Sequence, residues 1–413
     1  MFKKRGAPEK GFFAQNKLLI AIATLIGTVI GAGILGIPYV VAKTGFLYGL
    51  GMIIFIGVVF IFLNLFIGEI VLRTKGKHQL TGYAEKYLGK KGKIVMAISM
   101  TLGNYGALTA YLIGEGEALK SIFGMPGWLA YIFSSLPLAL GHFLQENMYL
   151  LLFFIVGFTI VSRGLKAAGK TELIAIILLI VVVFLTGIFS YNDIDKTNYT
   201  PFNPAFLFLP YGVILFAFIG SPGIPELAEV LEHNKAKMKK AIIIGSIVPI
   251  IIYVLFTVII VGLVGLDHFE LLEPNQRIAT VALSMYSSPY LGLLANFLAV
   301  LAMFTSFLTL GIALLEMYHY DYKLSRPWSL LLTFSVPLLI AVGGFSTFIA
   351  VLGFTGAFAG GLDGILLTLM FWKAKYLGNR KPEFSLGKMN VIGWILIIMF
   401  SVGILQQVWT SLF

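Results

Sequence analysis

Long runs of apolar residues alternate with short polar segments along the whole chain of 413 residues. An α-helix needs about 20 mainly apolar residues to cross the hydrocarbon core of a bilayer. Runs of this kind predict eleven transmembrane helices, at residues 18–42, 46–72, 94–119, 147–162, 172–190, 204–232, 241–266, 289–318, 328–342, 346–372 and 391–413. The alternating segments of about ten residues that a membrane β-barrel requires are not seen. The predicted fold class is therefore an all-α polytopic membrane protein.

The composition supports this class. Charged residues make up 12% of the chain and apolar residues 58%, and the mean hydropathy is +0.93. Because soluble proteins carry about 25% charged residues, this chain cannot cover a water-exposed surface of its size. It contains no Cys, which excludes disulfides and thiolate metal sites. The five His are scattered, and no phosphate loop or nucleophile elbow occurs, so an enzyme and a cofactor are not expected.

Lys and Arg are concentrated in alternate connecting segments. When the N-terminus is placed in the cytoplasm, 26 of the 30 Lys and Arg fall in cytoplasmic segments, and the other four are Lys43, Lys120, Lys196 and Arg277. Cytoplasmic loops of membrane proteins show this excess, which also favours contact with the anionic lipids of the bilayer. The bias predicts a multi-pass protein of the cell membrane with a cytoplasmic N-terminus and an outer C-terminus. Nucleic acid is not an expected partner.

The stretch at 125–143 is apolar enough for a further short span. However, no Lys or Arg lies between Lys120 and Arg163 to mark a cytoplasmic loop. Residues 128–140 are therefore predicted to form an interfacial helix on the outer side of the membrane, broken at Pro137.

Two predicted spans contain Gly and Pro near mid-depth. The first reads Gly-Ala-Gly-Ile-Leu-Gly-Ile-Pro at 31–38, and the sixth reads Gly-Ser-Pro-Gly-Ile-Pro at 220–225. Gly permits unusual backbone angles, while Pro38 lacks a donor and suits the first turn of a restarted helix. Freed amides at such a break attract an anion such as a carboxylate, and freed carbonyls attract a cation. The alternative is that these Gly residues only allow close helix packing or a kink.

The positions of the two breaks predict an internal symmetry. Breaks in spans one and six are expected of two inverted repeats of five helices, here 18–190 and 204–372. A cytoplasmic tail at 1–17 would precede the repeats, and an extra eleventh helix at 391–413 would follow them. Paired interruptions of this kind mark the substrate site of a secondary transporter.

The first break also resembles a family signature. Residues 31–39 read Gly-Ala-Gly-Ile-Leu-Gly-Ile-Pro-Tyr, and 42–46 read Ala-Lys-Thr-Gly-Phe. They are similar to the first-helix signature of the amino acid/auxin permease family, which includes hydroxy and aromatic amino acid permeases and sodium-coupled neutral amino acid transporters. Residues 210–226 resemble the sixth helix of that family. The family lies in the amino acid–polyamine–organocation superfamily, so the resemblance implies the leucine-transporter fold and import of a neutral amino acid by alternating access.

The resemblance implies where the substrate binds. Its carboxylate is expected at the amides of the first break, its ammonium at freed carbonyls of both breaks, and its side chain beside span six. Tyr111, four residues before Glu115, takes the relative position of a tyrosine that contacts the carboxylate. The predicted substrate-binding residues are Thr28, Ala32, Gly33, Ile34, Asn104, Tyr105, Tyr111, Phe216, Phe218, Ile219, Gly220 and Ser221. Because the chain has 18 Tyr and 35 Phe, plain packing is the alternative for each aromatic residue.

Two adjacent hydroxyls in span eight point to Na⁺ as the coupling ion, because hard cations prefer oxygen ligands. By the resemblance, the Na⁺ site would comprise Gly27, Ile30, Ala302, Thr305 and Ser306. Span five has no Lys after Lys170, whereas some proton-coupled relatives carry one there. The alternative is that the hydroxyls of span eight bond back to the preceding turn.

Coupling to H⁺ is the second hypothesis. Carboxylates inside a membrane are costly and are therefore functional candidates. The predicted proton carriers are Glu115, Glu226 and Asp363. Three further acids near inner helix ends are expected at a wet inner surface, namely Glu69, Glu229 and Glu316. Two alternatives come from other functional classes. An intramembrane enzyme would need clustered acids or His, and a channel would show flux that is not coupled to a second gradient.

Overall fold

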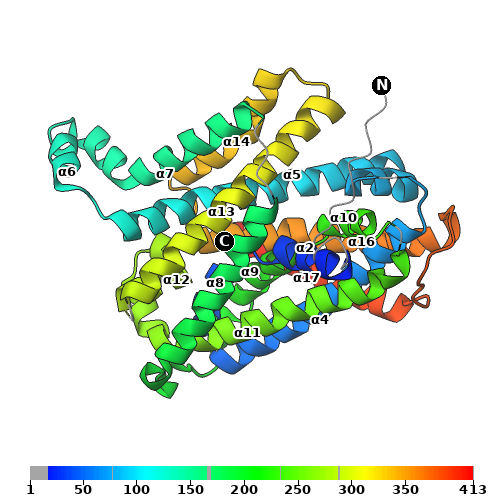
Figure 1. The fold of residues 1–413 in the computed structure, drawn as a ribbon, viewed down its shortest axis with the longest axis horizontal. Coiled ribbons are helices and arrows are strands. Elements are labelled where there is room, and N and C mark those ends of the chain that lie inside the picture. The colour runs from blue at the N-terminus through cyan, green and yellow to red at the C-terminus, as the bar shows by residue number, and fades with distance from the viewer. Residues whose placement is uncertain (1–16, 77, 165–168, 233, 287–288, 413) are drawn as a thin grey trace.

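The structure, a computed structural model, describes residues 17–76, 78–164, 169–232, 234–286 and 289–412, so all but the last residue of the predicted tail at 1–17 lies outside it. Every regular element within these ranges is helical. The main elements in chain order are α2 (Lys17–Val29), α3 (Gly33–Thr44), α4 (Phe46–Leu72), α5 (Leu80–Phe123), α6 (Gly127–Ser134), α7 (Leu138–Ser162), α8 (Gly169–Phe189), α9 (Leu209–Phe218), α10 (Gly223–Val230), α11 (Met238–Leu271), α12 (Ala279–Tyr286), α13 (Pro289–Glu316), η6 (Met317–Asp321), α14 (Arg326–Val342), α15 (Phe348–Phe354), η7 (Thr355–Gly360), α16 (Gly361–Leu377) and α17 (Asn390–Leu412). Figure 1 shows α6 and α7 at one end of the molecule and α10 and α16 towards the other.

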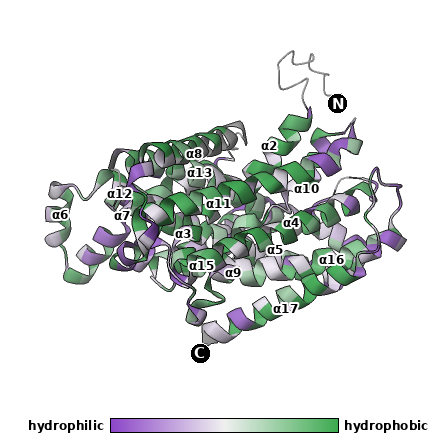
Figure 2. Cartoon of the chain, turned by 90° about the horizontal axis from the view of Figure 1, so that it is seen from below, coloured by the Kyte–Doolittle hydropathy of each residue, from purple (hydrophilic) through white to green (hydrophobic). Residues whose placement is uncertain are grey.

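The helices have the lengths and composition of membrane spans. Within the described chain, seven are long and apolar enough to cross a membrane, or eight if the bent pair of α2 and α3 counts as one span. A helix or a broken helix corresponds to each of the eleven predicted spans, but α14 has only 17 residues, so the count of eleven remains a prediction. Figure 2 shows apolar residues along most helices and hydrophilic residues gathered towards the ends of the molecule. The protein is an all-α, multi-pass membrane protein.

Some boundaries differ from those predicted. The helix expected at 128–140 is two elements, because α6 ends at Ser134 and Pro137 precedes the first residue of α7. The break at Pro137 is thus confirmed, but residues 138–140 already belong to the fourth span, which has 25 residues. The predicted third span is the second part of α5, an element of 44 residues that bends at Gly89, whose φ of 75° suits Gly.

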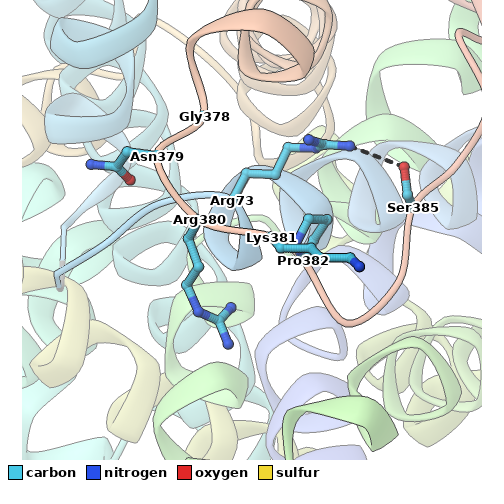
Figure 3. Close-up of a pocket in the computed structure, with 7 residues that line it drawn as sticks. All are labelled: Arg73, Gly378, Asn379, Arg380, Lys381, Pro382 and Ser385. Carbon is cyan, nitrogen blue, oxygen red and sulfur yellow. Dashed lines mark hydrogen bonds between the residues drawn. The ribbon is translucent and has the colours of Figure 1, made fainter.

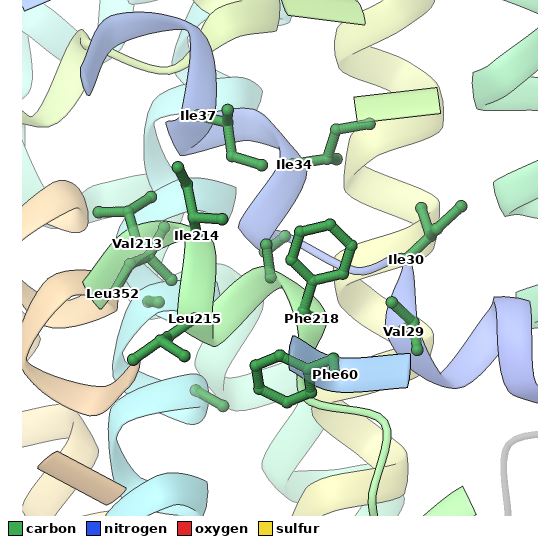
Figure 4. Packing of buried hydrophobic residues seen from close by; sticks show 14 of the residues in the cluster. Val29, Ile30, Ile34, Ile37, Phe60, Val213, Ile214, Leu215, Phe218 and Leu352 are labelled. Carbon is green, nitrogen blue, oxygen red and sulfur yellow. The ribbon is translucent and has the colours of Figure 1, made fainter. Parts of the chain in front are cut away.

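The core lies where α3, α4, α9 and α11 meet. α9 packs on α3 and α4, and α11 packs on α3 and α4 from another side. Figure 4 shows Ile34 and Ile37 of α3 facing Ile214 and Phe218 of α9. The ring of Phe218 stacks on that of Phe60 in α4, with a centroid distance of 6.0 Å. This apolar packing holds the first and sixth predicted spans side by side.

A polar cluster ties the end of α4 to α16 and to the segment that follows α16. Glu69 is fully buried and accepts hydrogen bonds from Arg73 at 2.7 Å, Lys375 at 2.6 Å, Ser385 at 2.9 Å and the amide of Leu386 at 2.7 Å. Figure 3 shows the adjoining pocket, in which the Arg73 guanidinium also reaches Ser385 at 3.1 Å. The prediction of a wet surface around Glu69 is therefore wrong, because its charge anchors two cations and a loop.

Candidate functional site

Helix one is broken at the predicted place. α2 ends at Val29, α3 begins at Gly33, and the two helices meet at 55°. Within the described ranges, the amides of Gly31 and Ala32 donate no backbone hydrogen bond. Pro38 lies in the second turn of α3 and not in its first, so the restart of the helix does not depend on it. The free amides give this end of α3 a partial positive charge.

Helix six is broken as well. α9 ends at Phe218, and the next residue, Ile219, has an extended backbone with φ −64° and ψ 107°. α10 begins at Gly223 after Pro222, and Pro225 sits in its first turn, where the missing amide costs no helical hydrogen bond. Among the described residues, the amides of Gly220 and Ser221 donate to no backbone carbonyl.

The two breaks lie against each other. A Cβ atom on Gly33 would come within 2.6 Å of the Cα atom of Ala217, and one on Gly223 would come within 2.7 Å of the Thr28 hydroxyl. Both glycines therefore permit a backbone approach that a side chain would prevent. α2 packs on α10, and α3 packs on α9. Each half of one broken helix thus has a neighbour from the other.

One tyrosine joins the two breaks. Tyr253 in α11 is fully buried, and its hydroxyl donates to the Val29 carbonyl at 3.0 Å and to the Ala217 carbonyl at 2.7 Å. These carbonyls belong to the C-terminal ends of α2 and α9, which carry partial negative charge. A hydroxyl has one hydrogen, so the two carbonyls share it. No sequence signal identified Tyr253, because an isolated Tyr in an apolar span does not reveal where its hydroxyl points.

Most of the predicted substrate-binding residues lie in the segments that form the breaks, namely Thr28, Ala32, Gly33, Ile34, Phe216, Phe218, Ile219, Gly220 and Ser221. Phe216 and Ile219 are half-buried. Phe218 is fully committed to packing, because its ring also lies 4.9 Å from that of Tyr253. In this structure Phe218 thus supports the break, and its role in binding the substrate stays a prediction.

The predicted residues of α5 divide into two groups. Tyr111 is buried, and its hydroxyl lies 3.6 Å from the position that a Cβ atom on Gly31 would take, so it reaches the first break. Tyr105 is used elsewhere: its hydroxyl donates to a carbonyl of α14 at 2.8 Å and lies 2.8 Å from that of Tyr318. Asn104 is half-buried and precedes Tyr105 in the same helix.

The two halves of the predicted Na⁺ site lie on helices with different main neighbours, and the site stays a prediction. Gly27 and Ile30 lie in α2 and directly after it, whereas Ala302, Thr305 and Ser306 lie in α13. α13 packs mainly on α5, α8 and α12, while α2 packs on α8, α10 and α11. The Thr305 hydroxyl is buried and bonds to carbonyls of its own preceding turn at 3.0 and 3.2 Å.

The acidic residues differ in their surroundings. Glu115 is fully buried, and neither of its carboxylate oxygens has a hydrogen-bond partner in the described chain. Asp363, near the start of α16, has one oxygen buried without a partner among the same residues. Glu226 and Glu229 are exposed on α10, and Glu316 is half-buried. Glu115 and Asp363 are therefore the acids that need a counter-charge or a proton.

A group of ion pairs lies at the other end of α4 from Glu69. Glu270, near the end of α11, holds the Lys43 ammonium at 2.7 Å and the Arg277 guanidinium at 3.2 Å. Arg277 also donates to the Tyr39 hydroxyl at 2.9 Å. The group links α3 to the end of α11 and contains two of the four cations that lie outside the predicted cytoplasmic segments.

Comparison with known proteins agrees with this geometry. Residues 14–410 match the tryptophan/tyrosine permease family. The chain is 25% identical over 407 residues to "Tyrosine-specific transport system 1" of Haemophilus influenzae, covering 95% of this chain and 96% of that protein. It is 26% identical over 368 residues to "Glutamine transporter 2" of Aliivibrio fischeri, covering 89% and 90% of the two chains.

A solved structure shares the fold. The crystal structure of MhsT in complex with L-phenylalanine matches with a TM-score of 0.66 at 17% identity, covering 94% of this chain and 98% of that one. This match confirms the leucine-transporter-like fold that the resemblance implied. The family match covers nearly the whole chain and excludes an enzyme, since the family is one of transporters. The chain belongs to the tryptophan/tyrosine permease family of membrane transporters.

Proposed function

We propose that the protein carries a neutral amino acid, with an aromatic one as the first candidate, into the cell by alternating access driven by a Na⁺ gradient. The observation that carries this proposal is the contact between two broken helices, each with two amides at its break that donate no backbone hydrogen bond in the described chain. The names of the relatives support an amino acid substrate. They mention tyrosine and tryptophan as well as glutamine.

The substrate carboxylate binds at the free amides of Gly31 and Ala32, where the N-terminal end of α3 favours negative charge. Tyr111 lies next to this point and donates its hydroxyl to the same carboxylate. The ammonium group binds carbonyls near Thr28, Phe216 and Ile219, because the carbonyls of Val29 and Ala217 are already shared by Tyr253. Opposite ends of one zwitterion thus face opposite ends of two helix dipoles.

The substrate side chain points towards the sixth span. Phe216 and Ile219 are half-buried there, and Gly220 and Ser221 follow them in the break. An aromatic ring gains from offset or edge contacts with a phenylalanine ring. This favours tyrosine, tryptophan or phenylalanine over a small amino acid.

Na⁺ binds when α2 approaches α13. The carbonyls at Gly27 and Ile30 then join the carbonyl of Ala302 and the two hydroxyls of Thr305 and Ser306 in an all-oxygen site. In the conformation described, α13 packs mainly on α5, α8 and α12, and α2 packs mainly on α10 and α11, so we expect the site to close when α2 and α13 move together. The ion pairs of Glu270 close the opposite end of α3 and have to part when that end opens.

H⁺ coupling is the alternative, and one observation favours it. Glu115 is fully buried with two unpartnered oxygens, a setting in which a carboxylate must find a positive charge or take up a proton. Uptake driven by a pH gradient in Na⁺-free buffer would select this alternative.

The test is uptake of radiolabelled tyrosine, tryptophan, phenylalanine and glutamine into proteoliposomes under imposed Na⁺ or pH gradients. We expect uptake of at least one aromatic amino acid to need inward-directed Na⁺. Thr305→Ala should raise the Na⁺ concentration for half-maximal uptake by roughly tenfold, the scale of about 1.4 kcal/mol of lost binding. Thr309→Ala, in the same helix and with its hydroxyl bonded to the Thr305 carbonyl at 3.0 Å, is the matched control. No uptake of any amino acid under either gradient would refute the transport proposal.

A further inference from the structure

A small cavity lies beside the break in helix six, apart from the predicted Na⁺ site. It has a volume of about 10 Å³ and is lined by residues of α4, of the break, of η7 and of α16. Its polar lining consists of Asn64 from α4, Ser221 from the break and Asp363 from α16. A cavity that holds one water molecule needs about this much space, so the cavity fits one water-sized or smaller guest.

Two residues of this lining each carry a side-chain oxygen atom that has no partner in the described chain. Asn64 is 1% exposed, and its side-chain nitrogen donates to the Ser246 hydroxyl at 3.1 Å, which leaves its Oδ1 atom without a hydrogen bond in the described chain. The Oδ1 atom of Asp363 is buried and equally unpartnered among those residues. Buried polar atoms are nearly always satisfied, so two orphans on one cavity indicate a missing positive or hydrogen-donating guest.

The neighbouring groups do not supply that guest. The Ser99 hydroxyl of α5 bonds to the Ala359 carbonyl at 2.9 Å and also interacts with the Asp363 carboxylate, yet the Oδ1 atom of Asp363 remains without a partner in the described chain. Asp363 forms no ion pair with any Lys, Arg or His that the structure describes. An ionised Asp363 would thus be uncompensated inside the membrane, which is unfavourable, so its carboxyl group needs a bound cation or a proton.

We propose that this cavity is a binding site for Na⁺, with the Asp363 carboxylate and the Asn64 side-chain oxygen as its side-chain ligands. A carboxylate and an amide oxygen are hard ligands that suit a hard cation, and Na⁺ is smaller than a water molecule. Ser221 lies on the same cavity, and its hydroxyl can add a third oxygen ligand from the break itself. The site differs from the one at Thr305 in every residue.

The location of the cavity gives the bound ion a role. Ile219 and Ser221 line the cavity and also belong to the break that is proposed to hold the substrate. A cation there neutralises Asp363 and holds the break against α4 and α16. By holding the break in place, the ion would strengthen substrate binding, and by linkage the substrate would strengthen ion binding by the same factor. This coupling rests on the proposed transport function, whereas the binding of Na⁺ itself does not.

The test is equilibrium binding of ²²Na⁺ to the purified full-length protein in detergent, with choline replacing Na⁺ to keep the ionic strength constant. Asp363→Asn should weaken the binding component by roughly tenfold or more, at least the loss seen when an outer-shell partner of a metal is removed. The double variant Asn64→Asp with Asp363→Asn returns one carboxylate and one amide to the cavity and should restore binding. Thr305→Ala should leave this component unchanged.

The outcomes separate the two proposals. A wild-type protein that binds no ²²Na⁺, or an Asp363→Asn variant with the wild-type isotherm, overturns the site even if amino acid uptake is intact. If Asp363→Asn loses ²²Na⁺ binding but the wild-type protein takes up no amino acid, the Na⁺ site stands and the transport function is refuted. If Asp363→Asn does not give a monodisperse protein, Asn64→Leu removes the other ligand, and unchanged binding in that variant overturns the proposal.

Discussion

Replacing Tyr253 by Phe tests whether the two breaks are held together by a single hydroxyl. The substitution keeps the ring, which packs against Phe218 with a centroid distance of 4.9 Å, and removes only the hydroxyl that reaches the Val29 and Ala217 carbonyls. Both carbonyls are then buried without that donor. Leaving a buried acceptor unsatisfied costs about 1–3 kcal/mol. Since one hydrogen serves both carbonyls, we expect a total loss within that range and not twice as much.

Two measurements report this loss of free energy. Thermal unfolding of the purified protein, monitored by the fluorescence of its five Trp, should show a lower transition temperature for Tyr253→Phe. Uptake in proteoliposomes should weaken by about 5-fold to 150-fold, the range that corresponds to 1–3 kcal/mol of coupling. The effect should appear mainly as weaker substrate binding, because the hydroxyl holds the ends of α2 and α9 next to the carbonyls that are proposed to bind the ammonium group.

Tyr211→Phe is the matched control. Tyr211 is also buried and lies in α9, but its hydroxyl makes a longer bond of 3.3 Å to the carbonyl of Met399 in α17, away from the breaks. A small loss of stability with unchanged uptake is expected for this variant. Wild-type stability and uptake in Tyr253→Phe, or an equal loss of uptake in Tyr211→Phe, would refute the role of Tyr253.

Two further predictions concern the close approach of the breaks and the buried charge cluster. Gly33→Val should abolish uptake, because a side chain there meets the Ala217 backbone at 2.6 Å. The control is Gly51→Val, which should transport normally because no atom lies within 4 Å of the added Cβ. Equal uptake in the two variants would contradict the packing argument. Glu69→Gln should lower stability by about 3–5 kcal/mol, the cost of breaking a buried ion pair, measured as a drop in the thermal transition. Glu85→Gln, which loses an exposed pair of 2.8 Å, should change it little, since such pairs contribute about 0–1 kcal/mol.

The sequence carried enough information to predict the helical class and both breaks. Gly and Pro in the middle of an apolar span are visible in a single sequence, and their effect on the backbone is local. The same reasoning placed Pro38 in the first turn of α3, whereas the helix restarts five residues earlier, at Gly33. A local signal thus finds a break, but the packing of α3 on α9 decides which residue ends it.

The contacts that complete the site could not be predicted in this way. Tyr253 and Asn64 are ordinary residues of apolar spans, and their roles depend on which helix faces they meet. Glu69 was expected at a wet surface because it lies near a helix end. The structure instead surrounds it with Lys375, Arg73 and the loop at Ser385, which is more than 300 positions away in the sequence. Polarity along one chain does not show which distant segment covers a residue.

The arrangement of these contacts bears on how an ion gradient could drive transport. Tyr253 already shares the carbonyl ends of α2 and α9, so the substrate ammonium has to bind residues next to them, towards Ile219. Ile219 also lines the cavity of Asp363. An empty cavity leaves a negative charge beside the ammonium site, which would hold a cationic group without any ion. A cavity filled by Na⁺ removes that charge and holds the break in place, so binding then depends on both ends of the substrate, carboxylate at α3 and ammonium at the break. On this reasoning the ion favours a zwitterion over a simple amine. Competition by tyramine against tyrosine should therefore decrease as Na⁺ rises, and competition that is independent of Na⁺ would show that the cavity and the break are not coupled.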